Sequence, residues 1–390
     1  MKIAIAYDCL FPNTVGGAER WYRNLAERLE DRHSVTYLTR TQWGDEGPGT
    51  SFETLAVSPA SGLYTASGRR RIWPPLRYGL GVFWHLLRNG RRYDAVHTAS
   101  FPYFHLLGAR VALWLSRSRA RLIVDWHEVW GRDYWRSYLG PIGGRIGFAV
   151  ERLCVRLSDR SFTFSRLAAG RLREYGHHAP VTRLTGQYSS APSDDDPPQQ
   201  ETVAEPDQPL IVAAGRHIPE KRMTAIPAAV AAARRRLPEI RCLILGDGPE
   251  TDLIRAEAVL RGVGDAIELR GRVGHAEVMR AIATATCLLH PSQREGYGLV
   301  ILEASSQGTP SIVVQGPENA AVELVEEGVN GFVLASADPE LLADAVVRVA
   351  EGGSELRSST IDWYRRHREQ LSLESSLREV EKSYSPAARR

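Results

Sequence analysis

Hydrophobic and polar positions alternate along the first half of the chain in two periods, one typical of strands and one of helices. Residues 2–7 and 122–126 are short apolar runs, as expected for strands buried on both faces. Between such runs, Trp21, Leu25 and Leu29 recur at the spacing that places side chains on one face of a helix. Strands that alternate with helices predict a parallel sheet covered by helices on both faces.

The same alternation continues to about residue 190. Further strands are predicted at 34–39, 94–98 and 161–164, and helices at 18–29, 147–157 and 167–175. Residues 189–209 are then polar, acidic and rich in proline, which predicts a linker or a flexible surface segment.

A second alternating series follows this segment. Its predicted strands are 210–214, 242–245, 266–269, 287–290 and 311–314, and its predicted helices are 223–237, 250–261, 275–284, 299–307, 318–327 and 339–350. We therefore expect an α/β protein with two doubly wound, Rossmann-like domains, the first at residues 1–190 and the second at residues 207–360. Ligands of such sheets lie beyond the carboxyl ends of the strands.

Composition fits this architecture. The 390 residues are 43% hydrophobic and 24% charged, as in ordinary soluble proteins. The apolar run at the N-terminus is too short for a secretory signal, and no run reaches the roughly 18 apolar residues of a membrane-spanning helix. We expect a cytoplasmic protein whose four well-separated cysteines are buried thiols.

The net charge of +3 conceals an asymmetry between the two halves. Residues 1–190 carry 27 Lys and Arg against 15 Asp and Glu, a balance of +12, and the other 200 residues carry 22 against 31, a balance of −9. The halves are therefore expected to meet different partners or to attract each other. Lysine is rare, since only Lys2, Lys221 and Lys382 are lysines, which draws attention to Lys221 in mid-chain.

Arginines and aromatic residues are mixed between residues 69 and 92. Arg69, Arg70 and Arg71 precede an apolar run that contains Trp84, and more arginines follow it. This mixture suits peripheral contact with an anionic membrane. The alternative is a helix with its apolar stripe in the core and its arginines in water, and both interpretations stay open. Nucleic acid is not an expected partner, because the aromatic residues are not spread along a basic groove.

The strongest candidate site lies between His290 and Glu303. A predicted strand ends at His290, a turn with Gly296 and Gly298 follows, and a helix begins near residue 299. Glycines permit close approach of a ligand, and a helix start offers free N–H groups to a phosphate. Glu295 and Glu303 can face one cleft, where carboxylates suit the hydroxyls of a sugar and a ribose. The alternative is a capping acid and a glutamate that faces solvent.

A second candidate group follows the first strand of the second domain. Arg216 and Lys221 can converge there on one diphosphate, although they could also be a pair of exposed loop cations. The turns 246–249 and 271–273 end two further strands and carry little weight by themselves.

In the first domain, Gly16 and Gly17 link the first strand to its helix, and His127 ends a later strand. The glycine spacing lacks the GxGxxG pattern and argues against an NAD enzyme. His127 has either a structural role or a role at the rim of a cleft.

Taken together, these motifs resemble the donor site of retaining GT-B glycosyltransferases of family 4, the glycosyl transferases group 1 type. The resemblance is carried by Gly215-Arg216 with Lys221, by the turn 246–249, and by the run 295–298 that ends in Glu303. The Gly16-Gly17 loop, His127 and the C-terminal segment extend it over nearly the whole chain. The chain departs from the family at residues 185–188, where a Gly-Val-Asp type turn is frequent, and at Tyr297, where phenylalanine is common.

The resemblance implies a role for each of these residues. Arg216 and Lys221 would bind and stabilise the donor diphosphate, Glu295 would hold sugar hydroxyls, and Glu303 would hold the ribose. Arg216, Lys221, Glu295 and His127 are the expected catalytic residues; the expected donor-binding residues are Gly16, Gly17, Gly215, Arg272, Val273, Gly296, Tyr297, Gly298, Leu299 and Glu303. A last helix at about 361–383 would pack back on the first domain.

The resemblance thus implies a hexosyltransferase that moves a sugar from a UDP- or GDP-sugar to a hydroxyl acceptor (a glycan, a lipid-linked molecule or a small molecule) with retention. No cofactor and no metal are expected, since the only Asp-x-Asp candidate, Asp194–Asp196, lies in the linker. A nucleotide-sugar epimerase or phosphorylase on the same architecture remains an alternative, as does a nucleotide-binding protein without catalysis. A glycoside hydrolase is disfavoured, because its two carboxylates would leave Arg216 and Lys221 without a role in the reaction.

Overall fold

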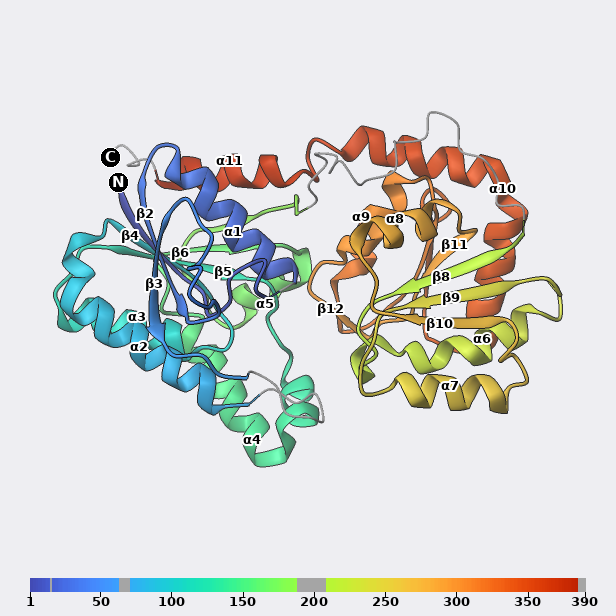
Figure 1. Ribbon diagram of the computed structural model, residues 1–390, viewed down its shortest axis with the longest axis horizontal. Coiled ribbons are helices and arrows are strands. Elements are labelled where there is room, and N and C mark those ends of the chain that lie inside the picture. Colours follow the sequence, from blue (N-terminus) through green and yellow to red (C-terminus); the bar gives the residue numbers. More distant parts are fainter. Residues whose placement is uncertain (15, 63–70, 188–207, 385–390) are drawn as a thin grey trace. The chain divides into compact units, whose positions relative to one another are not determined.

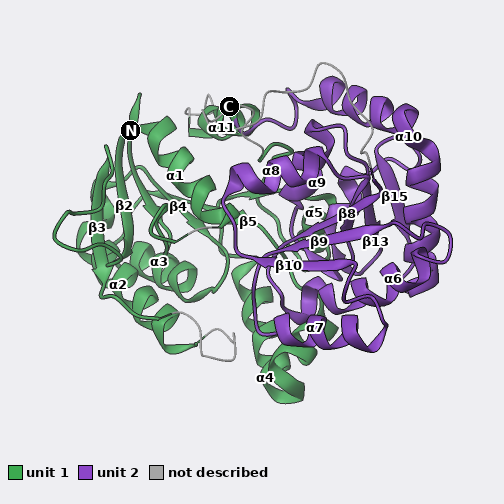
Figure 2. Ribbon diagram, turned by 45° about the vertical axis from the view of Figure 1, so that its right-hand side comes forward, with its two compact units in different colours: residues 1–187, 374–390 green, residues 188–373 purple. Residues whose placement is uncertain are grey.

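The computed structural model describes residues 1–14, 16–62, 71–187 and 208–384. It divides into two compact units (Figures 1 and 2): unit 1 is Met1–Gln187 with Glu374–Arg390, and unit 2 is Tyr188–Leu373. Most of the predicted linker, with Asp194–Asp196, lies outside the described residues, as do Arg69 and Arg70.

Unit 1 contains a seven-stranded parallel sheet in the order β3-β2-β1-β4-β5-β6-β7. Its strands are β1 (Lys2–Ala6), β2 (Ser34–Arg40), β3 (Glu53–Ser58), β4 (Ala95–Ala99), β5 (Arg121–Trp126), β6 (Arg160–Thr163) and β7 (Val181–Arg183). Every residue of β4 is buried, and so is nearly all of β5. Helices on both faces of a parallel sheet produce this burial, which explains the continuous apolar runs.

The α-helices in the described part of unit 1 are α1 (Gly17–Glu30), α2 (Trp73–Asn89), α3 (Phe104–Leu115), α4 (Arg132–Cys154), α5 (Arg166–Glu174) and most of α11 (Leu373–Tyr384). Helix α4 begins 15 residues before the predicted start at residue 147. It bends at Gly140, whose φ is 76°, because Pro141 cannot continue the hydrogen-bond ladder of a straight helix. Helix α3 was not predicted, and neither were β3 and β7.

A buried polar network holds the C-terminal helix α11 within unit 1. The Tyr384 hydroxyl lies 2.6 Å from His97 Nδ1, and His97 Nε2 lies 2.7 Å from Asp125 Oδ1. Trp21 Nε1 donates to the other oxygen of Asp125 at 2.7 Å. Burial alone would raise the pKa of Asp125, but the His97 imidazole outweighs it and keeps the pKa below its usual value. The network thus joins α11 to β4, β5 and α1.

The C-terminal helix differs in extent from the prediction. The single helix predicted at 361–383 is divided between α10 (Pro339–His367) and α11. Helix α10 is itself interrupted at Gly353, where φ is 44°.

Unit 2 contains a six-stranded parallel sheet in the order β10-β9-β8-β11-β13-β15. Its strands are β8 (Leu210–Ala214), β9 (Arg241–Leu245), β10 (Ile267–Gly271), β11 (Cys287–His290), β13 (Ser311–Val314) and β15 (Gly331–Leu334). Helices α6 (Ile226–Ala233), α7 (Thr251–Leu260), α8 (His275–Ala283), α9 (Leu299–Ser306) and α10 surround it. Two short strands, β12 (Arg294–Glu295) and β14 (Glu318–Asn319), pair with each other beyond the sheet.

The helix predicted at 318–327 is wrong. Residues 318–319 form β14, and only a 3₁₀ turn, Ala320–Leu324, follows. The buried Asn319 side chain explains the difference, because its amide donates to the carbonyl oxygens of Ser292 and Val314 and its oxygen accepts from the Ala321 N–H. Side-chain bonds to the backbone of this kind compete with a helix.

Each unit has its own hydrophobic core. The four cysteines are buried free thiols, as predicted, and burial raises the pKa of each. None of the helices in the described part of the chain combines the length and apolarity needed to cross a bilayer.

Candidate functional site

The turns after three neighbouring strands of unit 2 form one continuous layer of backbone. The Gly215 N–H donates to the Leu245 carbonyl at 2.9 Å, and the Gly246 N–H donates to the Gly271 carbonyl at 2.8 Å. Gly246 has a φ of 127°, and a Cβ there would lie 1.9 Å from the Gly215 carbonyl oxygen. Only glycine fits this position. The turns 246–249 and 271–273, which carry little weight as separate sequence motifs, therefore belong to one packed layer.

The loop after β8 is fixed to the loop after β9. The His217 N–H donates to the Asp247 carbonyl at 3.0 Å, and a Cβ on Gly248 would lie 2.4 Å from the His217 carbonyl oxygen. The buried His217 ring contacts Thr251 Oγ1 at 2.8 Å, and burial lowers the pKa of this histidine. Beside it, Arg216 is exposed and forms no ion pair within the described residues. The Arg216 guanidinium therefore lies on a loop held by backbone contacts and is available to bind an anion.

Lys221 and Glu295 form an ion pair that the sequence separates by 74 positions. Their side chains are 16% and 19% exposed, so the pair is largely shielded from water. The Gln293 N–H donates to the Glu220 carbonyl at 2.9 Å and ties the two segments together. His290, at the end of β11, places Nε2 3.1 Å from Glu295 Oε2, the oxygen that also meets Lys221.

This double contact sets the charge of Glu295. Burial would raise the pKa of the carboxyl, but Lys221 and the hydrogen bond from His290 together hold it far below its usual range. Glu295 is therefore ionised at neutral pH. Both contacts fall on Oε2, and Oε1 has no hydrogen-bond partner among the described residues, so it can accept a hydrogen bond from another group.

The chain turns sharply from Glu295 into helix α9. Gly298 caps the helix with a φ of 103°, and a Cβ there would lie 2.8 Å from Ala321 Cβ. Tyr297 is buried, whereas Gly296 and Leu299 are partly exposed. The first N–H groups of α9 have no partner within the helix, so this end attracts anions.

Glu303 lies on α9 one turn from its start. Its Oε1 lies 3.8 Å from Nδ1 of His275, the first residue of α8. Arg272 and Val273 lie just before that helix, with Arg272 exposed and Val273 half-buried. Glu303, which is predicted to bind the ribose, thus lies close to the start of α8, directly after the loop of Arg272 and Val273 that is predicted to flank the base.

Two residues of this site were missed by sequence reasoning. His290 was taken only as the end of a strand, although it is one of two side chains that contact Glu295 Oε2. Asn319 was placed inside a helix, although it braces the turn before Glu295. His290 could have been proposed from the sequence, because it is a polar residue at the end of a buried strand. The role of Asn319 could be recognised only from the three-dimensional structure.

The remaining predicted site residues lie in unit 1. Gly16 and Gly17 begin α1, but the backbone of Gly16 is extended (φ −175°) and a Cβ there would meet only the flexible Glu19 side chain. His127 follows β5 and stacks on Phe164, with ring centroids 4.5 Å apart. Its Nε2 is buried and has no hydrogen-bond partner among the described residues, and burial lowers its pKa. His127 is therefore a neutral ring with one nitrogen uncommitted.

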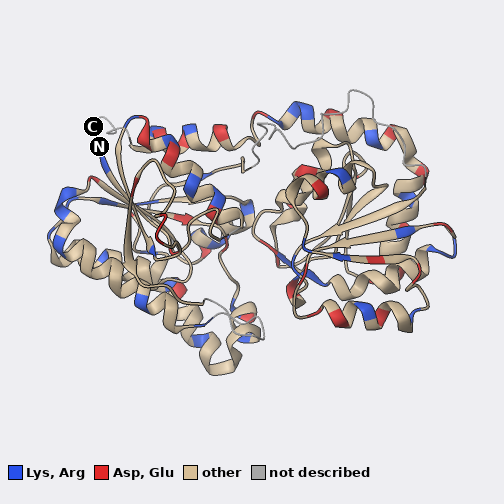
Figure 3. Cartoon of the chain, in the orientation of Figure 1, with Lys and Arg blue, Asp and Glu red and all other residues tan. Residues whose placement is uncertain are grey.

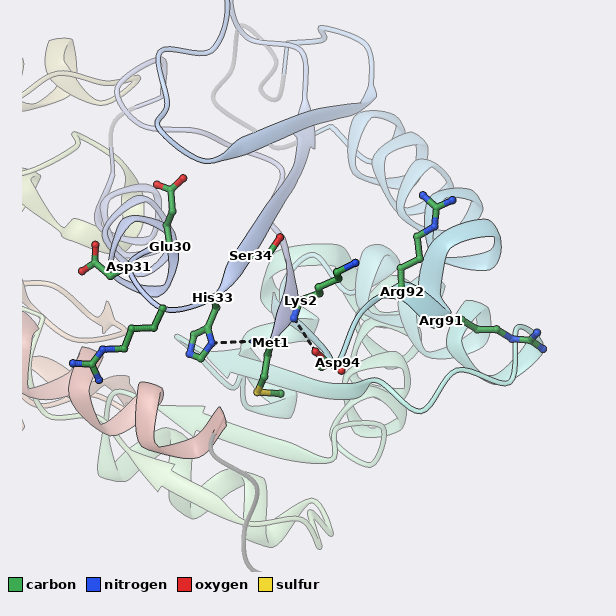
Figure 4. A pocket seen from close by; sticks show the side chains of 10 residues that line it. Met1, Lys2, Glu30, Asp31, His33, Ser34, Arg91, Arg92 and Asp94 are labelled. Carbon is green, nitrogen blue, oxygen red and sulfur yellow. Dashed lines mark hydrogen bonds between the residues drawn. The ribbon is translucent and has the colours of Figure 1, made fainter.

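A shallow hollow in unit 1 lies at the opposite edge of the sheet from His127. It is lined at the amino ends of β1, β2 and β4 by residues that include Met1, His33 and Asp94 (Figure 4). The Lys2 N–H donates to Asp94 at 2.7 Å, and the Met1 amino group lies 3.3 Å from His33. Ligands of doubly wound sheets lie at carboxyl ends, so we do not assign a substrate to this hollow.

The described residues contain no cluster of three or more His, Cys, Asp or Glu side chains that could hold a metal ion.

Family models match both units. The model described as "Glycosyltransferase Family 4" matches residues 15–184, and the model described as "Glycosyl transferases group 1" matches residues 195–366. Together they span most of the chain.

Two curated relatives are GDP-mannose-dependent α-(1-6)-phosphatidylinositol monomannoside mannosyltransferases. The chain is 26% identical to the one from Mycolicibacterium smegmatis over 268 residues, which is 59% of this chain and 69% of the relative. It is 30% identical to the one from Mycobacterium tuberculosis strain H37Rv over 150 residues, which is 37% of this chain and 38% of the relative.

Solved structures share the fold of the whole chain. The Anabaena protein HepE in complex with UDP and glucose has a TM-score of 0.71 at 18% identity, covering 99% of this chain and 100% of that one. Sucrose-phosphate synthase from Thermosynechococcus elongatus has a TM-score of 0.76 at 16% identity, covering 98% of each chain.

Proposed function

Because this chain belongs to the family 4 glycosyltransferases of the group 1 type, with the GT-B fold, we propose that it transfers a hexose from a nucleoside-diphosphate sugar to a hydroxyl acceptor. UDP- and GDP-sugars are the proposed donors. The relatives named for GDP-mannose and the structural neighbour that holds UDP support both bases, so the proposal covers both.

The ion pair of Lys221 with Glu295, beside the exposed Arg216, is the observation that carries the proposal. Transfer needs cations where negative charge develops on the departing diphosphate, and it needs an acceptor of hydrogen bonds for the sugar hydroxyls. Arg216 and Lys221 supply the first, and Oε1 of the ionised Glu295 supplies the second. Glu303 would bind the ribose, with Arg272 and Val273 near the base.

In the proposed reaction, the acceptor hydroxyl oxygen forms a bond to the anomeric carbon while the bond from that carbon to the diphosphate oxygen breaks. The hydroxyl proton passes to the departing diphosphate. Retention of anomeric configuration, by attack on the face that the diphosphate leaves, is proposed from the family resemblance. Arg216 and Lys221 together with the α9 N-terminus would stabilise the leaving group, so we propose that no metal is required.

A donor screen followed by a transfer assay tests the proposal. Thermal unfolding of the full chain is measured with UDP, GDP, ADP and their sugars, and the stabilising donor is then offered with sugar, glycan and glycolipid acceptors. A product that joins the donor sugar to the acceptor, formed equally in EDTA, is the expected result. Loss of all transfer in EDTA would overturn metal independence, and interconversion of the donor sugar without transfer would indicate an epimerase.

The acceptor is proposed to be reached partly through the basic unit 1. Its arginine-rich surface suits peripheral contact with an anionic membrane, at the cytoplasmic face where such donors occur, and a lipid-linked acceptor would then be within reach.

A further inference from the structure

A group of aromatic side chains lies at the carboxyl edge of the unit 1 sheet, the edge at which doubly wound folds bind their ligands. Phe101 comes two residues after the end of β4, and Trp130 comes four residues after the end of β5. These two strands pair with each other, so their ends are neighbours. Tyr134 and Tyr138 follow on the first turns of α4. We name this group of Phe101, Trp130, Tyr134 and Tyr138 the aromatic strip.

The rings of the aromatic strip have a definite arrangement. The Tyr134 and Tyr138 rings are nearly parallel, with an angle of 15° and centroids 6.0 Å apart. Both contact the Trp130 indole edge to face, with centroids 4.9 and 5.3 Å from it. Phe101 contacts the same indole, with centroids 4.9 Å apart. Trp130 is buried, Phe101 and Tyr134 are partly exposed, and Tyr138 is 37% exposed. A buried indole therefore supports rings that are open to solvent.

Hydrogen bonds hold the Trp130 backbone and its indole. The N–H of Trp130 donates to the buried Glu151 at 2.8 Å, and its carbonyl oxygen accepts from the Tyr175 hydroxyl at 3.1 Å. The indole N–H donates to Glu128 at 2.6 Å. The position of the central ring is therefore fixed from three directions.

The part of α4 that carries the two tyrosines is supported by the rest of the same helix. A Cβ on Gly144 would lie 2.6 Å from the Trp135 carbonyl oxygen, and one on Gly147 would lie 2.4 Å from the Trp135 ring. Nine residues of a straight helix would span about 13 Å, so α4 packs back on itself after the bend at Gly140. The aromatic strip is thus preorganised, and little ordering entropy opposes the binding of a ligand.

Polar side chains accompany the aromatic strip. Arg132, Asp133 and Arg136 are exposed on the same turns of α4 as the two tyrosines, and basic and acidic residues are interspersed along this helix (Figure 3). A ligand that fits offers an apolar face to the rings and hydroxyl groups to the charged side chains. A pyranose ring has this form, because the C–H groups on its face are apolar and its hydroxyls lie around its rim. A plain acyl chain would form no hydrogen bond with these side chains.

We propose that the aromatic strip is an acceptor subsite for a pyranose ring, so that the acceptor is a glycoside. The pyranose would stack on Tyr134 and Tyr138, because the negative face of an aromatic ring attracts C–H groups. The charged side chains of α4 would then bind its hydroxyls. The inference rests on the proposed function and narrows the acceptor from any hydroxyl compound to a sugar.

Acceptor kinetics of the full chain test the subsite. Methyl glycosides of glucose, mannose and galactose are offered with the donor that stabilises the protein. Tyr138→Leu keeps an apolar side chain without the ring, and it should raise KM for the accepted glycoside about three- to tenfold. Tyr138→Phe keeps the ring and should keep the wild-type KM. Neither variant should change kcat or KM for the donor, because stacking binds the ground state and the transition state equally.

Octyl glycosides of the same sugars distinguish a glycolipid from a free glycan as the source of the pyranose. A lower KM for the octyl form indicates a glycolipid, and equal KM values indicate a free glycan. In both cases the rise in KM for Tyr138→Leu should be present.

A second measurement needs no donor. Saturation-transfer NMR, with irradiation of the aromatic protons of the full chain, detects methyl glycosides that bind near aromatic rings, and glycerol is the acyclic comparison. The ring C–H protons of a glycoside should receive saturation from the wild type and from Tyr138→Phe. They should receive much less from Tyr138→Leu, and glycerol should receive little from any of the three proteins.

Trp114→Ala is the matched control. Trp114 is 74% exposed on the last turn of α3, and this turn lies at the amino edge of the sheet because α3 runs back from the carboxyl end of β4. The variant removes an exposed aromatic ring from the opposite edge and should change neither acceptor KM nor saturation transfer. Thermal unfolding followed by tryptophan fluorescence should give the wild-type midpoint for both Tyr138 variants, since this side chain is not part of the core.

Three results would overturn the subsite: an unchanged KM in Tyr138→Leu, an equal rise of KM in Trp114→Ala, and equal use of glycerol and of the glycosides as acceptors. A protein that binds glycosides through Tyr138 but forms no product would refute the proposed function alone. A protein that transfers sugar to glycosides with no dependence on Tyr138 would refute the subsite alone.

Discussion

Lys221 and Glu295 form an ion pair at the carboxyl ends of β8 and β11, where the sequence had assigned them separate tasks. The ammonium of the one determines the ionised state of the other. If Lys221 binds a diphosphate and Glu295 binds the attached sugar, the pair spans the bond to be broken. Replacing either residue should then also impair the function of the other in sugar transfer.

Lys221→Ala should lower kcat for transfer by about 10²–10³-fold and reduce the stabilisation by donor, because it removes a preorganised cation. It should also cost about 1–3 kcal/mol of folding stability, since Glu295 loses its partner. Because the pKa of Glu295 is depressed, the ion pair contributes to the free energy of unfolding above the carboxyl's ordinary pKa of 4.5. The contribution is lost as pH falls towards the lower pKa of the folded state. The difference in stability between wild type and variant should therefore become smaller in acid.

Arg216→Ala is the matched comparison. Its guanidinium is exposed and unpaired within the described residues, so the variant should lose donor stabilisation and kcat without loss of folding stability. Unchanged donor stabilisation in both variants would refute the diphosphate role.

His290 should act as a positioning residue for Glu295. Its Nε2 lies 3.1 Å from Glu295 Oε2, and its Nδ1 is buried without a partner among the described residues, so Nε2 is the nitrogen that can donate to the carboxylate. His290→Leu should lower kcat about tenfold with little change in nucleotide affinity, because the carboxylate loses a hydrogen bond that orients it. His290→Gln keeps a donor at a similar reach and should recover most of the rate.

The measurement is steady-state transfer kinetics beside calorimetric binding of the nucleotide. Equal kinetics for the leucine and glutamine variants would show that His290 only fills space.

Much of this organisation could be predicted from the sequence, and the exceptions have physical causes. Strands buried on both faces, such as 210–214 and 311–314, were located to the residue because short apolar runs rich in Val and Ile are typical of them. Edge strand β3 was missed because its residues are mostly not buried, so its pattern is weak. Helix α3 was missed because it is apolar on most sides and lacks a clear polar stripe.

The site shows the same division. Arg216, Lys221, Glu295 and Glu303 could be proposed because charged residues directly after buried strands or at a helix start are conspicuous. Their pairing could not, since the Lys221–Glu295 contact depends on the register of β8 beside β11. The role of Asn319 depends on β12 pairing with β14, two strands too short to leave a periodic signal.

Gly246→Ala should disrupt the layer of turns that carries the donor site. A Cβ there meets the Gly215 carbonyl oxygen at 1.9 Å, and a φ of 127° is unfavourable for alanine. We expect a loss of about 3 kcal/mol or more, with loss of nucleotide binding. Gly264→Ala is the control, because its Cβ would meet no atom within 4 Å and its φ lies outside the glycine region. Equal unfolding midpoints for the two variants would contradict the close packing of these turns.

Glu151 should make the stability of unit 1 depend on pH. It is fully buried on α4 and accepts hydrogen bonds from the Tyr103 hydroxyl, the Trp130 N–H and the Trp135 indole. Burial raises its pKa from 4.5 to about 7, against the effect of these donors. The folded state therefore holds a proton that the unfolded state has lost between these values. Stability should fall by about 3 kcal/mol as pH rises from 4.5 to 7 and change little above that.

Tryptophan fluorescence can follow this transition in the full chain, because eight of the nine tryptophans lie in residues 1–187 and only Trp363 lies in unit 2. Glu151→Gln keeps the shape without the charge, and subtraction of its pH profile removes the contributions of other carboxylates such as Asp125, whose lowered pKa has the opposite sign. The wild-type profile should fall relative to the variant between pH 4.5 and 7. Parallel profiles would mean that Glu151 stays ionised, with its three donors outweighing burial.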